Sequence, residues 1–222
     1  MCHEVIPRDR KLAPYVSVKT PVAVVRTDPA TAEAALKNMA RTGLLEGHKS
    51  KVLAGEPFGP TARSIDIAVN GVAGVAVAHL REAARAGVEG ERASGESLVQ
   101  LAKRFKEDFA QADASGDEPP LVYKARPLNG IWATAPYLHN GSVPSLWELM
   151  KKPSERVASF HVGAREFDPV EVGFVTDAGP SEFRVLDAEG NIVPGNSNRG
   201  HPFGTGMNDA KKRALIEYMK ML

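Results

Sequence analysis

The sequence has a single cysteine, Cys2, among its 222 residues. One thiol excludes internal disulfides and cysteine-rich zinc or iron–sulfur sites. Three roles remain for Cys2: a free thiol, an intermolecular thiol, or a covalent anchor for a cofactor. The cysteine content therefore does not reveal the compartment in which the protein works.

Long apolar runs and an excess of charge of one sign are also missing. The longest apolar candidate, residues 71–78, is far shorter than the roughly 18 residues that span a bilayer. A basic segment followed by an apolar one is missing at the start, so we predict no export signal in the chain as written. The 28 basic residues nearly balance the 27 acidic ones, so we expect no nucleic acid as a partner. Because the apolar runs are short, we also expect no membrane span.

Hydrolase, nucleotide and zinc-protease motifs are missing as well. The segment Asn140 to Pro144 does not fit G-x-S-x-G, and Gly200 to Gly206 lacks the lysine of a P-loop. Cys2-His3-Glu4 does not fit H-E-x-x-H. We therefore predict no catalytic residue.

Helical periodicity is present in several segments. Asp28-Pro29 provides helix-start residues, and the apolar spacing after them predicts a helix of about four turns ending at Gly43. Residues 96–110 show the clearest amphipathic pattern. We also predict a short helix over residues 145–152 and a terminal helix that is capped by Asn208.

Two other segments are predicted to be non-helical. Residues 111–120 combine turn formers, acids and a Pro-Pro pair, which indicates a surface loop. Residues 184–193 alternate apolar and polar side chains around Glu189-Gly190, which indicates a small exposed hairpin.

The most informative stretch runs from Tyr123 to Leu149, YKARPLNGIWATAPYLHNGSVPSLWEL. Its prolines and glycines prevent a long helix. Its aromatic and histidine content suits the wall of a cofactor site. At the start of the chain, the adjacent Cys2 and His3 have the order of the last two residues of a CxxCH haem-attachment motif. The first cysteine of such a motif would precede Met1, so we expect a truncated or mis-started chain.

Three segments carry a family resemblance: ARPLNGIWATAPYLHNGSVPSL, FHVGAREFDPVEVGF and GHPFGTGM. Together they resemble the C-terminal haem domain of dihaem cytochrome c peroxidase-like proteins, with rubber-oxygenase relatives most similar. The resemblance implies a mainly α, cytochrome c-like fold with long irregular loops and a small β-hairpin, in a single domain over residues 1–222. It also implies haem c with its iron as the cofactor, and a periplasmic or secreted location.

The iron ligands follow from the chemistry of haem c. Cys2 would anchor the haem and His3 would be the proximal ligand. His201 and Met207 are both candidates for the second axial position. We favour His201 because its flanking glycines allow the backbone to approach a flat cofactor, whereas methionine is often core filler. The resemblance implies the same assignment.

Other residues are candidates for cofactor contacts. Arg126 can pair with haem propionates through its guanidinium, or it is ordinary surface charge. Trp132 and Tyr137 can line the haem edge, or they belong to the core. His139 is either an iron ligand or a buried histidine that is hydrogen-bonded to the backbone or to a haem propionate. The same sequence context fits both interpretations, and we favour the second.

Taken together, these residues predict an electron-transfer haem domain of a dihaem peroxidase- or oxygenase-like oxidoreductase. The expected partner is a missing N-terminal haem domain or a redox protein, and we expect no peroxide or oxygen chemistry on this chain alone. The alternative is a haem-free remnant or interaction domain without redox activity. Sequence upstream of Met1 would distinguish the two.

Overall fold

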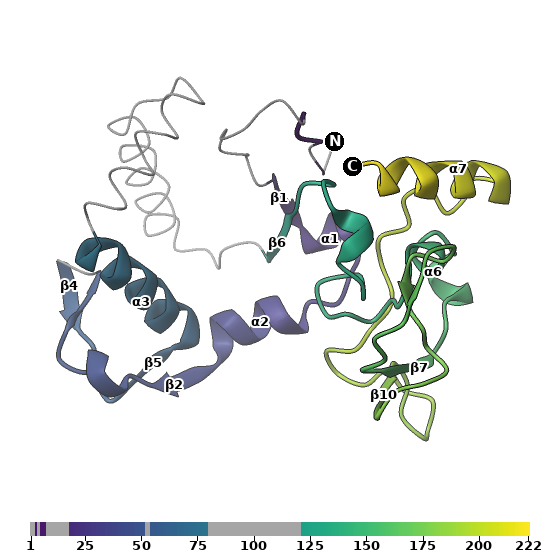
Figure 1. Cartoon of the computed structure of the whole chain (residues 1–222). Helices are drawn as coiled ribbons and strands as arrows, with labels where there is room; N and C mark the ends of the chain where they lie inside the picture. The colour runs from purple at the N-terminus through teal and green to yellow at the C-terminus, as the bar shows by residue number, and fades with distance from the viewer. Residues whose placement is uncertain (1–2, 4, 8–17, 52–53, 80–120) are drawn as a thin grey trace. The chain divides into compact units, whose positions relative to one another are not determined.

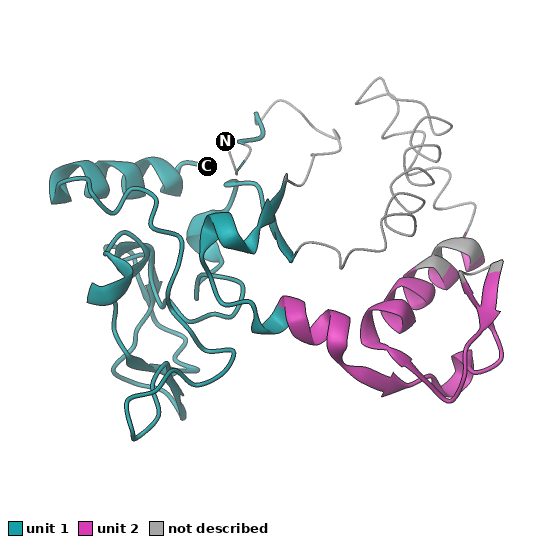
Figure 2. Ribbon diagram, turned by 180° about the vertical axis from the view of Figure 1, so that it is seen from behind, with its two compact units in different colours: residues 1–7, 15–31, 121–222 teal, residues 8–14, 32–120 magenta. Residues whose placement is uncertain are grey.

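The computed structural model describes residues 3, 5–7, 18–51, 54–79 and 121–222 (Figure 1). The chain divides into two compact units (Figure 2). Unit 1 consists of residues 1–7, 15–31 and 121–222, and unit 2 of residues 8–14 and 32–120. The single domain predicted over residues 1–222 stays a prediction. Predicted features at Cys2 and over residues 96–110 and 111–120 lie outside the described residues.

Unit 2 combines two small antiparallel sheets with one longer helix. Its described elements are β2 (Met39–Arg41), η1 (Gly43–Leu45), β3 (Lys49–Lys51), β4 (Ala54–Pro57), β5 (Thr61–Arg63) and α3 (Ser64–Ala78). β2 pairs with β5 and β3 pairs with β4, and α3 contacts β2, β3 and β5. Helix α3 therefore contacts both ladders of this unit.

The predicted helix from Asp28 to Gly43 is shorter than expected. Helix α2 covers Ala30–Lys37, and it begins after Asp28, whose Oδ1 accepts a hydrogen bond of 2.8 Å from the amide of Ala30. The chain then leaves the helix at Met39, which pairs with Arg63 across the β2–β5 ladder. Long-range strand pairing overrides the local helical pattern here.

Unit 1 contains most of the described elements in short pieces. They are β1 (Val18–Pro21), α1 (Val22–Val25), β6 (Val122–Ala125), η2 (Ile131–Ala133), α6 (Leu146–Leu149), η3 (Pro153–Glu155), β7 (Ser159–Val162), β8 (Phe167–Asp168), β9 (Gly173–Phe174), β10 (Ser181–Arg184) and α7 (Asp209–Lys220). Three antiparallel pairs hold them: β1–β6, β7–β10 and β8–β9. The β1–β6 ladder joins the N-terminal part of the chain to the start of the aromatic stretch.

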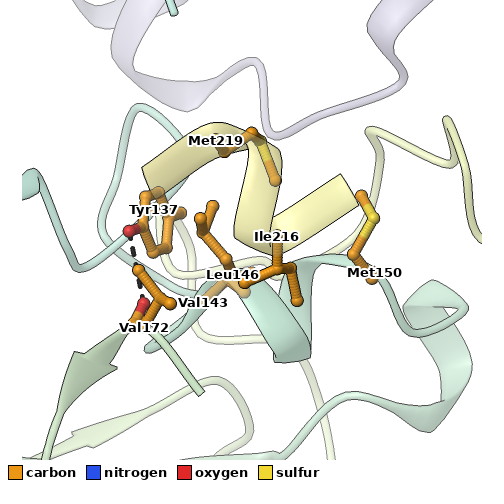
Figure 3. Close-up of a cluster of buried hydrophobic side chains, with 7 residues drawn as sticks. All are labelled: Tyr137, Val143, Leu146, Met150, Val172, Ile216 and Met219. Carbon is orange, nitrogen blue, oxygen red and sulfur yellow. Dashed lines mark hydrogen bonds between the residues drawn. The ribbon is translucent and has the colours of Figure 1, made fainter. Parts of the chain in front are cut away.

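The core of unit 1 lies between the aromatic stretch and the terminal helix (Figure 3). Its buried side chains are Tyr137, Val143, Leu146, Met150, Val172, Ile216 and Met219. Ile216 and Val143 have no exposed surface. Burying side chains of this kind contributes roughly 1.5–3 kcal/mol each before the loss of conformational entropy. This core therefore anchors the irregular loops of unit 1.

The predicted terminal helix is confirmed. Asn208 caps α7, because its side-chain oxygen accepts from the amide of Lys211 at 3.0 Å. The buried face includes Ile216 and Met219, whereas Tyr218, which the apolar spacing places on the same face, is 45% exposed. The predicted helix over residues 145–152 is present as the single turn α6.

The predicted hairpin is also confirmed. Leu186 bridges Ile192, and the amide of Asp187 donates to the carbonyl of Asn191 at 2.9 Å. Gly190 at the turn has φ 84°, a conformation that glycine adopts without steric cost.

The prediction of a mainly α fold is wrong. The described residues form five two-stranded sheets beside their helices. The reason is the content of 16 prolines and 20 glycines, which interrupt helices and favour turns. The irregular loops that the resemblance implied are instead organised by short β ladders.

Candidate functional site

His3 is held against the start of the aromatic stretch. Its Nδ1 lies 2.7 Å from the carbonyl oxygen of Arg126. A carbonyl can only accept, so Nδ1 carries the proton and donates, which leaves Nε2 of a neutral ring free to bind a metal. Metal-binding histidines usually make such a second hydrogen bond, which fixes the ring orientation.

Asn129 fixes the backbone just after His3. Its Nδ2 donates to the carbonyl of Ile6 at 2.8 Å, and its Oδ1 accepts from the amide of Ile6 at 2.7 Å. This two-bond clamp holds Ile6 beside Asn129, in the same loop whose Arg126 carbonyl contacts His3. The N-terminal histidine is therefore placed by the loop that follows β6.

Gly200 brings the second histidine to its place. A Cβ at Gly200 would come within 2.5 Å of the amide nitrogen of Thr27 and within 2.6 Å of the carbonyl carbon of Arg26. The residue also has φ 90°, which favours glycine. Only a residue without a side chain allows the loop to approach the α1 C-terminus this closely.

His201 itself has a left-handed backbone. Its φ is 46°, a conformation that is uncommon for residues other than glycine but is visited by histidine. Such a backbone costs on the order of 1–3 kcal/mol. The amide of His201 donates to the carbonyl of Val25 at 2.8 Å, so the neighbouring chain holds the strained residue in place.

The two imidazoles lie close together in an edge-on arrangement. The ring centroids of His3 and His201 are 6.2 Å apart, at an interplanar angle of 62°. Two imidazoles that bind one metal ion from opposite sides through bonds of about 2 Å have centroids roughly 6 Å apart. The spacing of His3 and His201 therefore fits a pair of axial ligands, and the ligand assignment stays a prediction.

The environment keeps His201 neutral. Burial, together with the nearby His3 and Arg156, lowers the pKa of His201 to about 4. Its Nδ1 is buried with no hydrogen-bond partner among the described residues. A neutral ring with an unused polar atom suits a metal-binding role.

Arg156 is the polar anchor of the His201 loop. Its guanidinium is buried, and it donates to four backbone carbonyls: those of Leu149, Asn198, Gly200 and His201. Burial lowers the pKa of Arg156 to about 10, so the side chain is charged at neutral pH. Neither the residue type nor the spacing had indicated this role.

Asp28 ties three segments together beside the same loop. Its Oδ2 accepts from the amide of Ser197 at 3.1 Å, and its carbonyl accepts from the hydroxyl of Tyr123 at 2.9 Å. The segment before His201 is thus bound to the N-terminal chain and to β6. From the sequence, Asp28 was expected only to begin a helix.

His139 stacks on Tyr123. The ring centroids are 4.0 Å apart and the planes differ by 19°. Nδ1 of His139 lies 3.5 Å from Oγ1 of Thr27. Partial burial lowers the pKa of His139, and the nearby Asp28 opposes that shift. These contacts fit the structural interpretation of His139.

The segment around His139 is bound to the loop that leads to His201. The Nδ2 of Asn140 donates to the carbonyls of Gly195 and Ser197, at 3.0 and 2.9 Å. The hydroxyl of Ser142 donates to the same Ser197 carbonyl at 2.9 Å. The Asn-Gly-Ser sequence of the aromatic stretch therefore supports the ligand loop directly.

Three other predicted residues have different settings. The side chain of Arg126 is exposed, and only its carbonyl contacts His3. Trp132 is 42% exposed. Tyr137 lies in the core, where its hydroxyl donates to the carbonyls of Ile131 and Val172 at 3.1 and 3.3 Å. Burial raises the pKa of Tyr137, so its hydroxyl stays neutral.

Met207, the other candidate for the second axial position, packs in the core. A Cβ built on Gly204 would lie 3.1 Å from the methyl group of Met207 and 3.5 Å from the sulfur of Met150. Met207 contacts the buried cluster of unit 1. Its setting is that of a packing residue.

The comparison with protein families concerns the aromatic stretch. The segment that matches a known family begins in β6 and ends in β7. Residues 122–161 match the family model described as RoxA-like, cytochrome c-like. The match confirms the resemblance that the sequence had indicated.

Cytochrome c-like domains bind haem c and transfer electrons, and they usually work outside the cytoplasm. The RoxA-like segment contains Arg126, His139 and Arg156, whereas His3 and His201 lie outside it.

Two similar proteins are known from Sinorhizobium fredii. The uncharacterized protein y4iJ is 44% identical over 117 residues, which cover 49% of this chain and 19% of y4iJ. The uncharacterized protein y4iM is 49% identical over 55 residues, which cover 25% of this chain and 12% of y4iM. The chain therefore spans less than a fifth of the length of these relatives.

The described residues lack two further features. They contain no group of three or more histidine, cysteine, aspartate or glutamate residues that could hold a metal ion. A haem iron needs only two axial protein ligands, because the porphyrin supplies the others. Among the described helices, none has the length and apolar character to span a membrane.

Proposed function

We propose that this chain is a haem c electron-transfer domain in which His3 and His201 are the two axial ligands of the iron. The observation that carries the proposal is the 6.2 Å separation of the two imidazole centroids. The tautomer that the Arg126 carbonyl imposes on His3 supports it. The RoxA-like segment beside them adds the family context.

Each residue has a distinct task in this proposal. Cys2 anchors the cofactor covalently, and His3 and His201 hold the iron from its two faces. Arg126 pairs with a haem propionate, since its guanidinium is exposed and the structure records no ion pair for it among the described residues. Trp132 and His139 line the site, and Tyr137 supports its wall from the core.

Haem c, when bound, supplies a one-electron couple of its iron. With both axial positions taken by protein side chains, no open position remains for peroxide or oxygen. We therefore propose that this chain transfers electrons to or from a second haem domain of a dihaem peroxidase- or oxygenase-like oxidoreductase. A periplasmic or secreted location follows from the family context.

The test begins with attachment. The chain is extended at its start to give Cys-x-Met1-Cys2-His3 and is expressed in a periplasm that matures c-type cytochromes. We expect a haem-staining band on a denaturing gel, and Cys2→Ser should lose most of the stain. A blank gel for the extended chain, with the protein confirmed by blotting, would support the haem-free interaction domain instead.

The second part tests the ligands. His201→Asn removes the imidazole but keeps a residue that tolerates the left-handed backbone. We expect it to convert a six-coordinate low-spin spectrum into a high-spin one. Met207→Leu is the matched control and should leave the spectrum unchanged. The reverse pattern would show that Met207 is the ligand.

A further inference from the structure

The guanidinium of Arg156 bonds to backbone carbonyls alone. Nη1 donates to Asn198 at 2.6 Å and to Gly200 at 3.0 Å. Nη2 donates to Leu149 at 3.1 Å and to His201 at 3.2 Å. Three of the four acceptors therefore belong to the loop that carries His201.

A carboxylate partner is missing from this arrangement in the described part of the chain. Glu148 is close enough to act on the charge of Arg156, but its carboxylate bonds to the Nζ of Lys151 and to the amide of Val157. Buried arginines are usually paired with acids. The guanidinium of Arg156 donates only to carbonyl oxygens. Its role is therefore to fix the positions of those carbonyls.

The core fixes the side of Arg156 that lies away from the His201 loop. Arg156 follows η3, and its acceptor Leu149 is the last residue of α6, whose neighbours Leu146 and Met150 are buried in the core. The planar fork of arginine spans several acceptors at fixed angles, which the single ammonium group of lysine does not. The side chain thus connects a packed helix to the His201 loop.

The loop needs such a connection. His201 has φ 46° and Gly200 has φ 90°, and the carbonyls of both residues accept from Arg156. Phe203, whose ring lies 5.2 Å from that of His201, is 45% exposed. Because Phe203 is largely exposed, its ring does little to orient the loop. The backbone contacts set the orientation instead.

We propose that Arg156 is a positioning residue that holds the His201 loop in the conformation that places the imidazole 6.2 Å from that of His3. This inference rests on the proposed function, because it gives the loop its purpose as the carrier of an iron ligand. Arg156 acts through the carbonyls of residues 198, 200 and 201 and does not itself contact the iron.

The experiment uses the extended, haem-loaded chain with Arg156→Met and Arg156→Lys. Arg184→Met is the matched control, because Arg184 is an exposed arginine of the same unit whose side chain bonds to Glu182. The optical spectrum reports the high-spin fraction, and added imidazole reports whether the distal position is open. The haem stain reports attachment separately.

We expect Arg156→Met to keep its haem, to gain a high-spin fraction and to bind added imidazole, which restores the low-spin spectrum. Arg156→Lys should show the same change to a smaller extent, and Arg184→Met should match the wild type. A folded Arg156→Met that stays low-spin and does not respond to imidazole overturns the proposal. If Arg156→Met does not fold, Arg156→Lys decides by the same criteria.

A measurement without haem separates this proposal from the proposed function. In the haem-free protein, hydrogen exchange at the amide of His201, which donates to Val25, should be at least tenfold faster in Arg156→Lys than in Arg184→Met. Unchanged exchange overturns the positioning role. A wild type that takes up no haem but shows this difference refutes the iron-ligand function and leaves the loop anchor standing.

Discussion

The two units of this chain differ in how they bury their side chains. Unit 1 has the buried cluster of Figure 3 and the close pair His3 and His201. Among the described residues of unit 2, Phe58 is the only buried hydrophobic side chain, whereas Leu44 is 96% and Val72 is 72% exposed. A site that needs fixed angles is therefore built on the better-packed unit, as precise positioning requires.

The polar groups show the same contrast. In unit 1, buried Arg156 and Asp28 join segments that are far apart in the sequence. In unit 2, buried Thr42 and Asn70 bond to carbonyls that are closer in the sequence: Thr42 to Gly59, and Asn70 to Ser50 and Asp66. These contacts of unit 2 span 4 to 20 residues of sequence, whereas the bond between Ser197 and Asp28 in unit 1 spans 169.

The largest expected effect compares the two cores. Ile216→Ala removes a side chain with no exposed surface and should lower the free energy of unfolding by about 2–5 kcal/mol. Val72→Ala in unit 2 should change it by no more than about 0.5 kcal/mol, because Val72 is exposed. Urea unfolding followed by circular dichroism measures both. Similar losses for the two variants would break the comparison.

The second prediction concerns acid. The pKa of His201 is about 4 in the folded chain against an ordinary 6.5, so the unfolded chain takes up a proton between these values and the folded chain does not. The stability of haem-free unit 1 should therefore be complete above pH 6.5 and fall as the pH drops towards 4. The loss is on the order of 3 kcal/mol.

Fluorescence can follow this loss in unit 1 alone, since Trp132 and Trp147 are the two tryptophans of the chain. Urea midpoints are measured between pH 4 and 7. His201→Asn has no titrating imidazole and should show a flatter profile. An equal acid slope in this variant would assign the loss to other groups.

The third prediction concerns the cap of α7. Asn208→Ala removes the acceptor for the amide of Lys211 and should destabilise unit 1 by about 1 kcal/mol. Asn208→Asp keeps an acceptor and should stay close to the wild type. Tryptophan fluorescence during urea unfolding measures both. A loss in Asn208→Asp as large as in Asn208→Ala would contradict the capping role.

The last prediction concerns a hydrogen bond in unit 2. Thr42→Val removes the hydrogen bond of 2.6 Å from the Thr42 hydroxyl to the carbonyl of Gly59, which should cost about 0.5–1.5 kcal/mol. Thr42→Ser keeps the hydroxyl and serves as the control. Hydrogen exchange of the β2–β5 amides reports the change. If exchange in unit 1 becomes faster by the same factor, the two units unfold together.

Local sequence was sufficient for several features. Asn208 and the apolar spacing after it predicted α7, and Glu189-Gly190 predicted the hairpin, because capping and turn chemistry act over a few residues. The aromatic stretch was correctly expected to be irregular. Helix α2 was predicted too long, because β2 pairs with a strand that lies twenty residues or so farther along the chain.

By itself, the sequence determined the candidate ligands: His3 follows from its cysteine neighbour and His201 from its glycines. Only the tertiary structure decided that their rings lie 6.2 Å apart, that Asn129 clamps the N-terminal segment, and that Arg156 holds the His201 loop. The physical reason is the sequence separation over which each interaction acts. Caps, turns and periodicity are set by neighbours in the chain, whereas a buried guanidinium finds its carbonyls only after the core has brought distant segments together.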